Sequence, residues 1–136
     1  MRIVVGFLRS PEGRAALERA IEETRRRDAE LLVVHSTRGR HHDVAREVIA
    51  YREEFERLGQ RLEGERIAYQ LTEYVRDQSP ARDLLAAAEE HDADLIVIGV
   101  RRRSPVGKLV LGSNAQEILL QATCDVLAVK PPTPTA

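Results

Sequence analysis

The sequence contains four short apolar runs, separated by longer segments whose apolar residues follow a helical period. The runs are rich in valine and isoleucine and do not alternate with polar residues. This pattern is typical of strands covered on both faces of a parallel sheet. A less apolar, alternating segment, AYQLTEYV at 68–75, is expected to form a fifth strand at a sheet edge. The four runs are IVVGFL at 3–8, LLVV at 31–34, LIVIGV at 95–100 and VLAV at 126–129.

The segments between the runs carry helix signals. Ser10-Pro11 and Ser79-Pro80 each combine an N-cap residue with a proline at the first helical position. In the first segment Leu17, Ala20 and Ile21 fall on one helical face, and the other segments repeat these steps of three and four. Strands and helices therefore alternate. This order predicts an α/β fold, a doubly wound five-stranded parallel sheet with right-handed crossovers and helices on both faces.

The length of 136 residues suits one domain, which we expect to span residues 1–130. The remaining residues, PPTPTA at 131–136, are rich in proline and are expected to form a flexible tail. The formal net charge is −1, so the chain has no overall basic field that would attract nucleic acid or an anionic membrane. Neither is expected as a partner.

A single cysteine, Cys124, excludes a disulfide within the chain and a zinc site built on several cysteines. We expect it to be a buried, inert thiol, which fits a reducing compartment. The N-terminal apolar run at 3–8 is too short for a membrane span or a signal-peptide core. The sequence therefore predicts a cytoplasmic location.

The candidate site is the stretch VIGVRRRSPVGKLVLGSN at 97–114, which leads from a buried strand to the start of the last helix. In open α/β sheets, ligands bind beyond the carboxyl ends of the strands, where the strand order switches. A helix start suits phosphate, Gly112 allows close backbone approach, and Ser113 offers a hydroxyl at the expected N-cap. The stretch is neither a P-loop nor a dinucleotide fingerprint. Alternatively, Gly99, Gly112 and Ser113 only build the connection.

Several segments together resemble the universal stress protein family. Its nucleotide-binding members carry the motif G-x2-G-x9-G-[S/T] after the fourth strand, where the phosphates and ribose of an adenine nucleotide bind. Gly99, Gly112 and Ser113 match the first, third and last motif positions. The resemblance extends over SPEGRAALERA at 10–20, ADLIVIG at 93–99 and SNAQEILLQATCDVLAVK at 113–130.

This resemblance implies a strand order of 3-2-1-4-5 and a regulatory role in the stress response. It also implies ATP or another adenine nucleotide as the ligand. In the family the last strand often pairs across a two-fold axis. A homodimer through residues 126–130 is therefore expected, because such pairing satisfies the backbone groups of an edge strand.

Three positions depart from the family pattern. Arg102 replaces the second glycine of the motif, Leu8 stands where ATP-binding members often place an acidic residue, and Ala115 replaces a Ser or Thr beyond the motif. Members without the full motif are thought not to bind ATP. A dimeric interaction module that binds no nucleotide is therefore the alternative function.

Three consecutive arginines, Arg101, Arg102 and Arg103, suggest how phosphate would be held despite these departures. Their guanidinium groups can form forked, charge-assisted bonds to phosphate, with Lys108 assisting. Alternatively, the arginines are solvated or pair with Asp or Glu side chains of a partner subunit. By resemblance the backbone of His35 would meet the adenine, whereas the simpler interpretation is a polar residue at a strand end. The predicted nucleotide-binding residues are Gly99, Arg101, Arg102, Arg103, Gly112, Ser113, Asn114 and His35.

The sequence offers no set of nucleophile, base and acid that would mark a dedicated enzyme. The serines considered have no partnering His and Asp suggested by the sequence; they are Ser10, Ser36, Ser79, Ser104 and Ser113. Weak ATP hydrolysis stays open, although it would need a positioned water and a metal. The adjacent His41 and His42 do not share a helix face, so no metal site is predicted.

Overall fold

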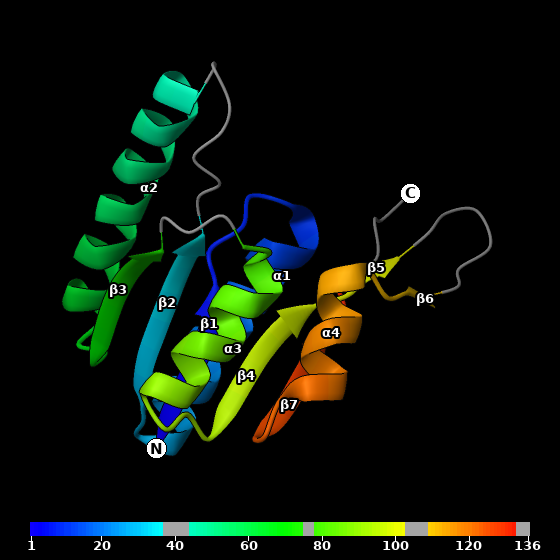
Figure 1. The fold of residues 1–136 in the computed structure, drawn as a ribbon. Coiled ribbons are helices and arrows are strands. Elements are labelled where there is room, and N and C mark those ends of the chain that lie inside the picture. Colours follow the sequence, from blue (N-terminus) through cyan, green and yellow to red (C-terminus); the bar gives the residue numbers. More distant parts are fainter. Residues whose placement is uncertain (37–43, 75–77, 103–108, 133–136) are drawn as a thin grey trace.

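The computed structural model describes residues 1–36, 44–74, 78–102 and 109–132. Within these residues, five strands form one sheet in the order β3-β2-β1-β4-β7, and every neighbouring pair is parallel (Figure 1). The predicted sheet and strand order are confirmed, and the alternating segment forms the edge strand β3. The strands are β1 (Arg2–Gly6), β2 (Glu30–Ser36), β3 (Tyr69–Tyr74), β4 (Leu95–Gly99) and β7 (Asp125–Val129).

Helices cover both faces of the sheet. The described helices are α1 (Pro11–Arg27), α2 (Val44–Gly64), α3 (Pro80–Glu90) and α4 (Ser113–Gln121). Residues of α1 and α2 pack in one core cluster, whereas residues of α3 and α4 pack in the other. Figure 1 shows α3 and α4 on the near face. None of the helices within the described residues is long and apolar enough to cross a membrane.

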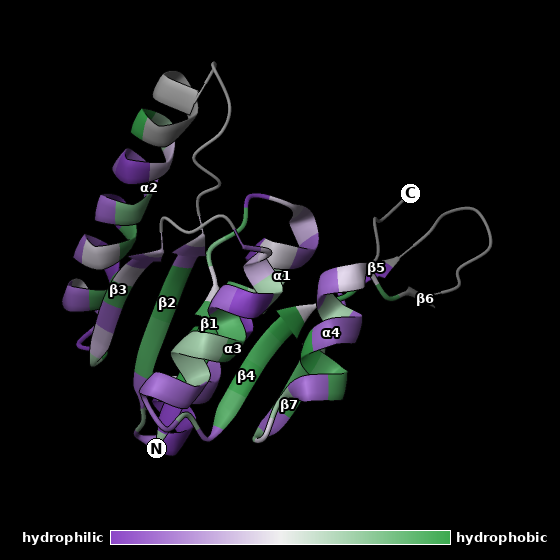
Figure 2. Ribbon diagram, viewed as in Figure 1, coloured by the Kyte–Doolittle hydropathy of each residue, from purple (hydrophilic) through white to green (hydrophobic). Residues whose placement is uncertain are grey.

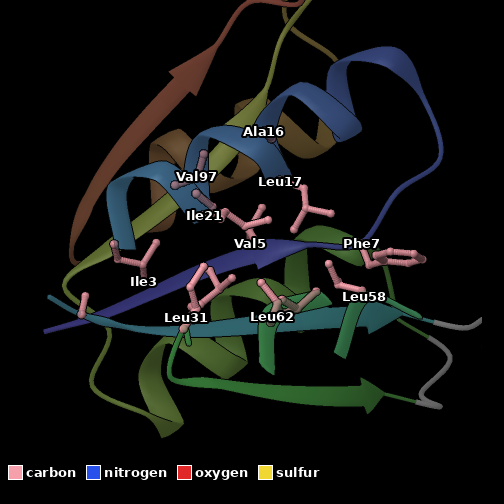
Figure 3. Close-up of a cluster of buried hydrophobic side chains, with 14 of the residues drawn as sticks. Ile3, Val5, Phe7, Ala16, Leu17, Ile21, Leu31, Leu58, Leu62 and Val97 are labelled. Carbon is pink, nitrogen blue, oxygen red and sulfur yellow. The ribbon is translucent and has the colours of Figure 1, made fainter. Parts of the chain in front are cut away.

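The alternation of side chains along each strand divides the core into two layers. In β1, Ile3 and Val5 face α1 and α2, while Val4 faces α3 and α4, and all three are fully buried. Figure 2 shows the apolar strands between helices whose outer faces are polar. Figure 3 shows the first layer, in which Leu58 and Leu62 of α2 pack over the sheet. The continuous apolar runs thus arise from burial on both faces.

Two short strands lie between β4 and α4, where the sequence predicted only a connection. β5 (Arg101–Arg102) and β6 (Leu109–Val110) pair antiparallel, with Arg101 opposite Val110 and Arg102 opposite Leu109. Strands of two residues are too short to show a periodic pattern, so no sequence pattern indicated them. The pairing carries the start of the arginine run away from the main sheet (Figure 1).

Candidate functional site

The candidate site lies at the carboxyl ends of β1 and β4, which are neighbours in the sheet. The chain leaves β1 for α1 on one face and leaves β4 for α4 on the other, so this is the point where ligands bind in open α/β sheets. A small cavity of about 70 Å³ lies here, which we call the crevice. Gly6, Leu8, Gly99, Asn114 and Ala115 contribute to its lining.

The start of α4 differs from the prediction. The N-cap is Gly112, in extended conformation, and it makes no side-chain capping hydrogen bond. Ser113 is the first helical residue, so its hydroxyl does not occupy the N-cap as the sequence suggested. Gly112, Ser113 and Asn114 are all exposed. The first-turn amides of α4 therefore lack the side-chain acceptor that usually satisfies a helix start.

Asn114 connects the start of α4 to the start of α3. Its Oδ1 accepts a hydrogen bond from the backbone N–H of Ala81 at 3.4 Å. Ala115 is buried among residues of α3 and β4, including Ala81 and Ile98. A methyl group at position 115 thus serves packing, and it offers no hydroxyl to a ligand.

Gly99 is held close against the first turn of α1. A Cβ atom at this position would lie 2.1 Å from the carbonyl oxygen of Glu12 and 2.5 Å from its carbonyl carbon. No side chain fits at that distance, so helix packing alone accounts for this glycine. By contrast, a Cβ atom at Gly112 would meet no described atom within 4 Å.

The arginine run is described only in part. The Nε of Arg101 lies 3.1 Å from Oε1 of Glu12 in α1, and the Arg101 side chain is 73% exposed. Arg102 contributes backbone to β5, and Arg103, Ser104 and Lys108 lie outside the described residues. Arg101 therefore pairs with a carboxylate of its own chain, a partner that the sequence analysis did not consider.

His35 does not line the crevice. Its imidazole is buried under α2, where it stacks on Tyr51 with ring centroids 4.5 Å apart, and Phe7 approaches it edge-on. This burial lowers the pKa of His35 below its usual value. The Glu73 carboxylate, 3.9 Å from Nδ1, opposes that shift, and Arg9 adds to it. The side chain is therefore a neutral core group.

Leu8 follows β1 at the mouth of the crevice, with 48% of its surface exposed.

The sequence analysis did not single out the carboxylate of Asp83, which lies in the first turn of α3. Asp83 is fully buried, accepts a hydrogen bond from the Ser36 hydroxyl, and has no partner for Oδ1 within the described residues. The sequence signal that could have identified Asp83 is an acidic residue in the first turn of a predicted helix, because the helix dipole stabilises a carboxylate there.

The other candidate residues have local structural roles or lie outside the described part of the chain. The hydroxyls of Ser10 and Ser79 cap α1 and α3. Cys124 is half-buried, and this burial raises the pKa of its thiol, which reduces its reactivity. His41 and His42 lie outside the described residues. Among those described, no group of three or more His, Cys, Asp or Glu side chains is arranged to hold a metal ion.

Comparison with known proteins agrees with this architecture. A universal stress protein of Mycolicibacterium smegmatis is 43% identical over 129 residues, which cover 95% of this chain and 97% of that protein. The structure of a universal stress protein from Archaeoglobus fulgidus superposes with a TM-score of 0.79 at 34% identity, covering 96% of this chain and 98% of that one. The structure of the universal stress protein from Archaeoglobus fulgidus in complex with dAMP superposes with a TM-score of 0.75 at 31% identity over the same shares of both chains. The family model for universal stress proteins matches residues 1–130, and the chain belongs to this family.

Proposed function

We propose that this protein is a regulatory module of the stress response that binds an adenine nucleotide in the cytoplasm. The observation that carries the proposal is the start of α4, which lies at the switch point of the sheet with no side-chain cap. Uncapped amides and the positive end of the helix dipole favour phosphate. The dAMP complex of the Archaeoglobus fulgidus protein supports an adenine nucleotide as the ligand class.

The proposed site combines the crevice with the exposed surface beside it. Pockets for small ligands usually enclose about 300 Å³ or more, whereas the crevice encloses about 70 Å³. Most of the nucleotide must therefore lie at the mouth of the crevice, with its phosphates over the start of α4. The proposed contacts are those predicted from the sequence, namely Gly99, Arg101, Arg102, Arg103, Gly112, Ser113, Asn114 and the backbone of His35.

Arg101 can exchange its present partner for phosphate at little cost. Its pair with Glu12 is largely solvent-exposed on the arginine side, and exposed pairs contribute about 0–1 kcal/mol. A forked bond to phosphate is stronger than such a pair. The role is one of binding, and the proposal assigns no catalytic residue.

The test is calorimetric titration of the wild type and of Arg102→Gly with ATP, AMP and cyclic AMP at two salt concentrations. Arg102→Gly restores the glycine of the family motif. If Arg102 grips phosphate, the substitution weakens ATP binding by about tenfold, because a charge-assisted hydrogen bond contributes about 1.5–3 kcal/mol. If Arg102 obstructs the site, the substitution creates or strengthens binding.

A matched control is Arg66→Gly, which removes the same charge just before β3, an edge strand that does not pair with β1 or β4. Arg66 is exposed, precedes β3 and has a positive φ of 58°, which glycine adopts readily. This variant should bind ATP as the wild type does. Absence of ATP, AMP and cyclic AMP binding by both the wild type and Arg102→Gly would refute the nucleotide proposal.

The second candidate function is a dimeric interaction module that binds no nucleotide, and the edge position of β7 favours it. β7 ends the sheet at one side, and α4 beside it exposes Leu119 at 42% and Leu120 at 84%. Pairing of two copies through residues 126–130 would cover unpaired backbone groups. Light scattering at micromolar concentration should give a dimer mass that Leu127→Lys or Val129→Lys reduces to the monomer mass. A wild-type monomer would count against this function.

A further inference from the structure

A second hollow, separate from the crevice, lies between α1 and α2. We call it the arginine groove; it encloses about 340 Å³, within the usual range for small-ligand sites. Its floor contains Phe7, Leu17 and Leu58, and its rim carries Arg9, Arg14 and Arg57. Leu8 lines both hollows. The groove uses none of the proposed phosphate contacts.

The floor of the groove is apolar and firmly packed. Phe7, Leu17 and Leu58 keep only 8%, 9% and 6% of their surface exposed. Figure 3 shows them at one end of the core cluster, away from Ile3. Leu8, in contrast, presents 48% of its surface. An apolar group lying on this floor would therefore cover Leu8 and gain hydrophobic contact without displacing the core.

The charges around the groove are unevenly satisfied. Its lining holds the guanidinium groups of Arg9, Arg14, Arg57 and Arg61 and the carboxylate of Glu54. Arg9 bonds Glu54 at 3.1 Å and lies 4.3 Å from the centre of the Tyr51 ring. Arg61 makes two bonds to Glu18, at 2.6 and 2.8 Å, and a third to Glu65 at 2.7 Å. Arg9 and Arg61 are therefore already paired.

The excess positive charge remains on Arg14 and Arg57. No hydrogen bond or ion pair holds Arg14 within the described residues, and Arg57 approaches Glu53 only at 4.0 Å, with both side chains largely exposed. Arg14 belongs to α1 and Arg57 to α2, so both helices of the groove present a guanidinium group at the rim. Two such groups complement one anionic head group.

We propose that the arginine groove binds a small amphiphile with one anionic head and an apolar body. The body lies on Phe7, Leu8, Leu17 and Leu58, and Arg14 and Arg57 bind the head, which is a carboxylate or a phosphate. This ligand site goes beyond the proposed nucleotide function, because residues of α1 and α2 line it and it needs no contact with α4.

The test is calorimetric titration of the full chain with decanoate, with decyl phosphate as the second head group and decanol as the neutral control. Decanoate or decyl phosphate should bind saturably and decanol about tenfold more weakly, because decanol has no charge for the arginines to bind. The ratio of the two anionic affinities identifies the preferred head. In spectra of methyl-labelled protein, the ligand should shift the signals of Leu8, Leu17 and Leu58.

Three variants test the assigned contacts. Arg14→Ala combined with Arg57→Ala should weaken binding by about tenfold or more, since both head contacts are lost. The matched control is Arg52→Ala, an exposed arginine of α2 that does not line the groove, and it should bind as the wild type does. Leu8→Glu places a carboxylate beside the floor and should abolish binding. Unfolding midpoints of all variants check that they fold.

Several outcomes would overturn the proposal. These are a lack of saturable binding by either anionic probe, equal binding of decanol, or equal weakening by Arg52→Ala. The chain could instead self-associate, with Leu8→Glu abolishing the self-association and decanoate failing to compete with it. That result would assign the groove to a second copy of the chain. The ATP titration is independent of these results, so failure of the nucleotide proposal and failure of this one are distinguishable.

Discussion

The start of α4 contrasts with the starts of α1 and α3. In α1 the Ser10 hydroxyl accepts a hydrogen bond from the Gly13 N–H at 3.1 Å, and in α3 the Ser79 hydroxyl accepts one from the Arg82 N–H at 3.2 Å. Both of these helices have proline at the first position, whereas α4 begins after Gly112 with neither device.

This contrast separates helix starts that stabilise the fold from one that is available to a ligand. A side-chain cap satisfies a first-turn amide and so contributes about 1 kcal/mol to folding. A helix without the cap gives up that contribution and leaves its amides to water or to an anion. The starts of α1 and α4 both lie near the crevice and Arg101, but Ser10 caps α1, whereas the start of α4 has no side-chain cap.

The largest effect is expected where β4 passes the start of α1. Gly99→Ala forces a Cβ atom to within 2.1 Å of the Glu12 carbonyl oxygen, so the first turn of α1 must move. We expect a loss of about 3 kcal/mol in the free energy of unfolding, as in overpacked cores. Urea denaturation at fixed protein concentration measures this loss.

Gly6→Ala on the neighbouring strand is the matched control for Gly99→Ala. A Cβ atom at Gly6 would lie 3.4 Å from Cδ1 of Leu84, which is ordinary contact with a flexible side chain. Its effect should stay below about 1 kcal/mol. Equal losses for the two variants would show that packing against α1 does not require Gly99. The match to the family motif would then be the only explanation for this glycine.

The next effect tests the helix starts directly. Ser10→Ala and Ser79→Ala should each lower the free energy of unfolding by about 1 kcal/mol, because each leaves a first-turn amide without its acceptor. Ser113→Ala should cost less than about 0.5 kcal/mol, because Ser113 lies inside α4 and supplies no cap. Thermal and urea unfolding of the three variants provide the comparison. A loss of about 1 kcal/mol for Ser113→Ala would remove the contrast.

Much of the fold follows from local patterns in the sequence. Continuous apolar runs identified the three inner strands β2, β1 and β4 and the edge strand β7. The alternating pattern correctly placed β3 at the other edge. The caps at Ser10 and Ser79 were also correct, because a serine followed by proline leaves few other conformations for the chain. Such signals depend only on residues close in sequence.

The details of the candidate site depend on contacts that the sequence does not show. Gly112 and Ser113 are adjacent, and either can cap a helix, so the sequence placed the N-cap one residue too late. His35 is covered by Tyr51, which is sixteen residues further along the chain and on another element. The buried carboxylate of Asp83 similarly depends on Ser36 from β2. Tertiary packing decided each of these positions.

A small gain in stability is expected from Gly112→Asp, which gives the start of α4 a side-chain cap like those of α1 and α3. The backbone at Gly112 has φ −66° and ψ 165°, which any residue adopts, and a Cβ atom there would meet no described atom within 4 Å. Aspartate should cap the first turn and favour the helix dipole, so stability should rise by about 0.5 kcal/mol.

The same substitution should weaken ATP binding by about tenfold or more, because the new carboxylate occupies the first-turn amides and repels phosphate. Gly112→Ala is the control: it leaves these amides uncapped, loses about 0.5 kcal/mol of stability and should retain ATP affinity. Unfolding midpoints and ATP titrations of both variants give the two readouts. A more stable Gly112→Asp that still binds ATP as the wild type does would place the phosphates away from α4, and would leave its open start without a function in nucleotide binding.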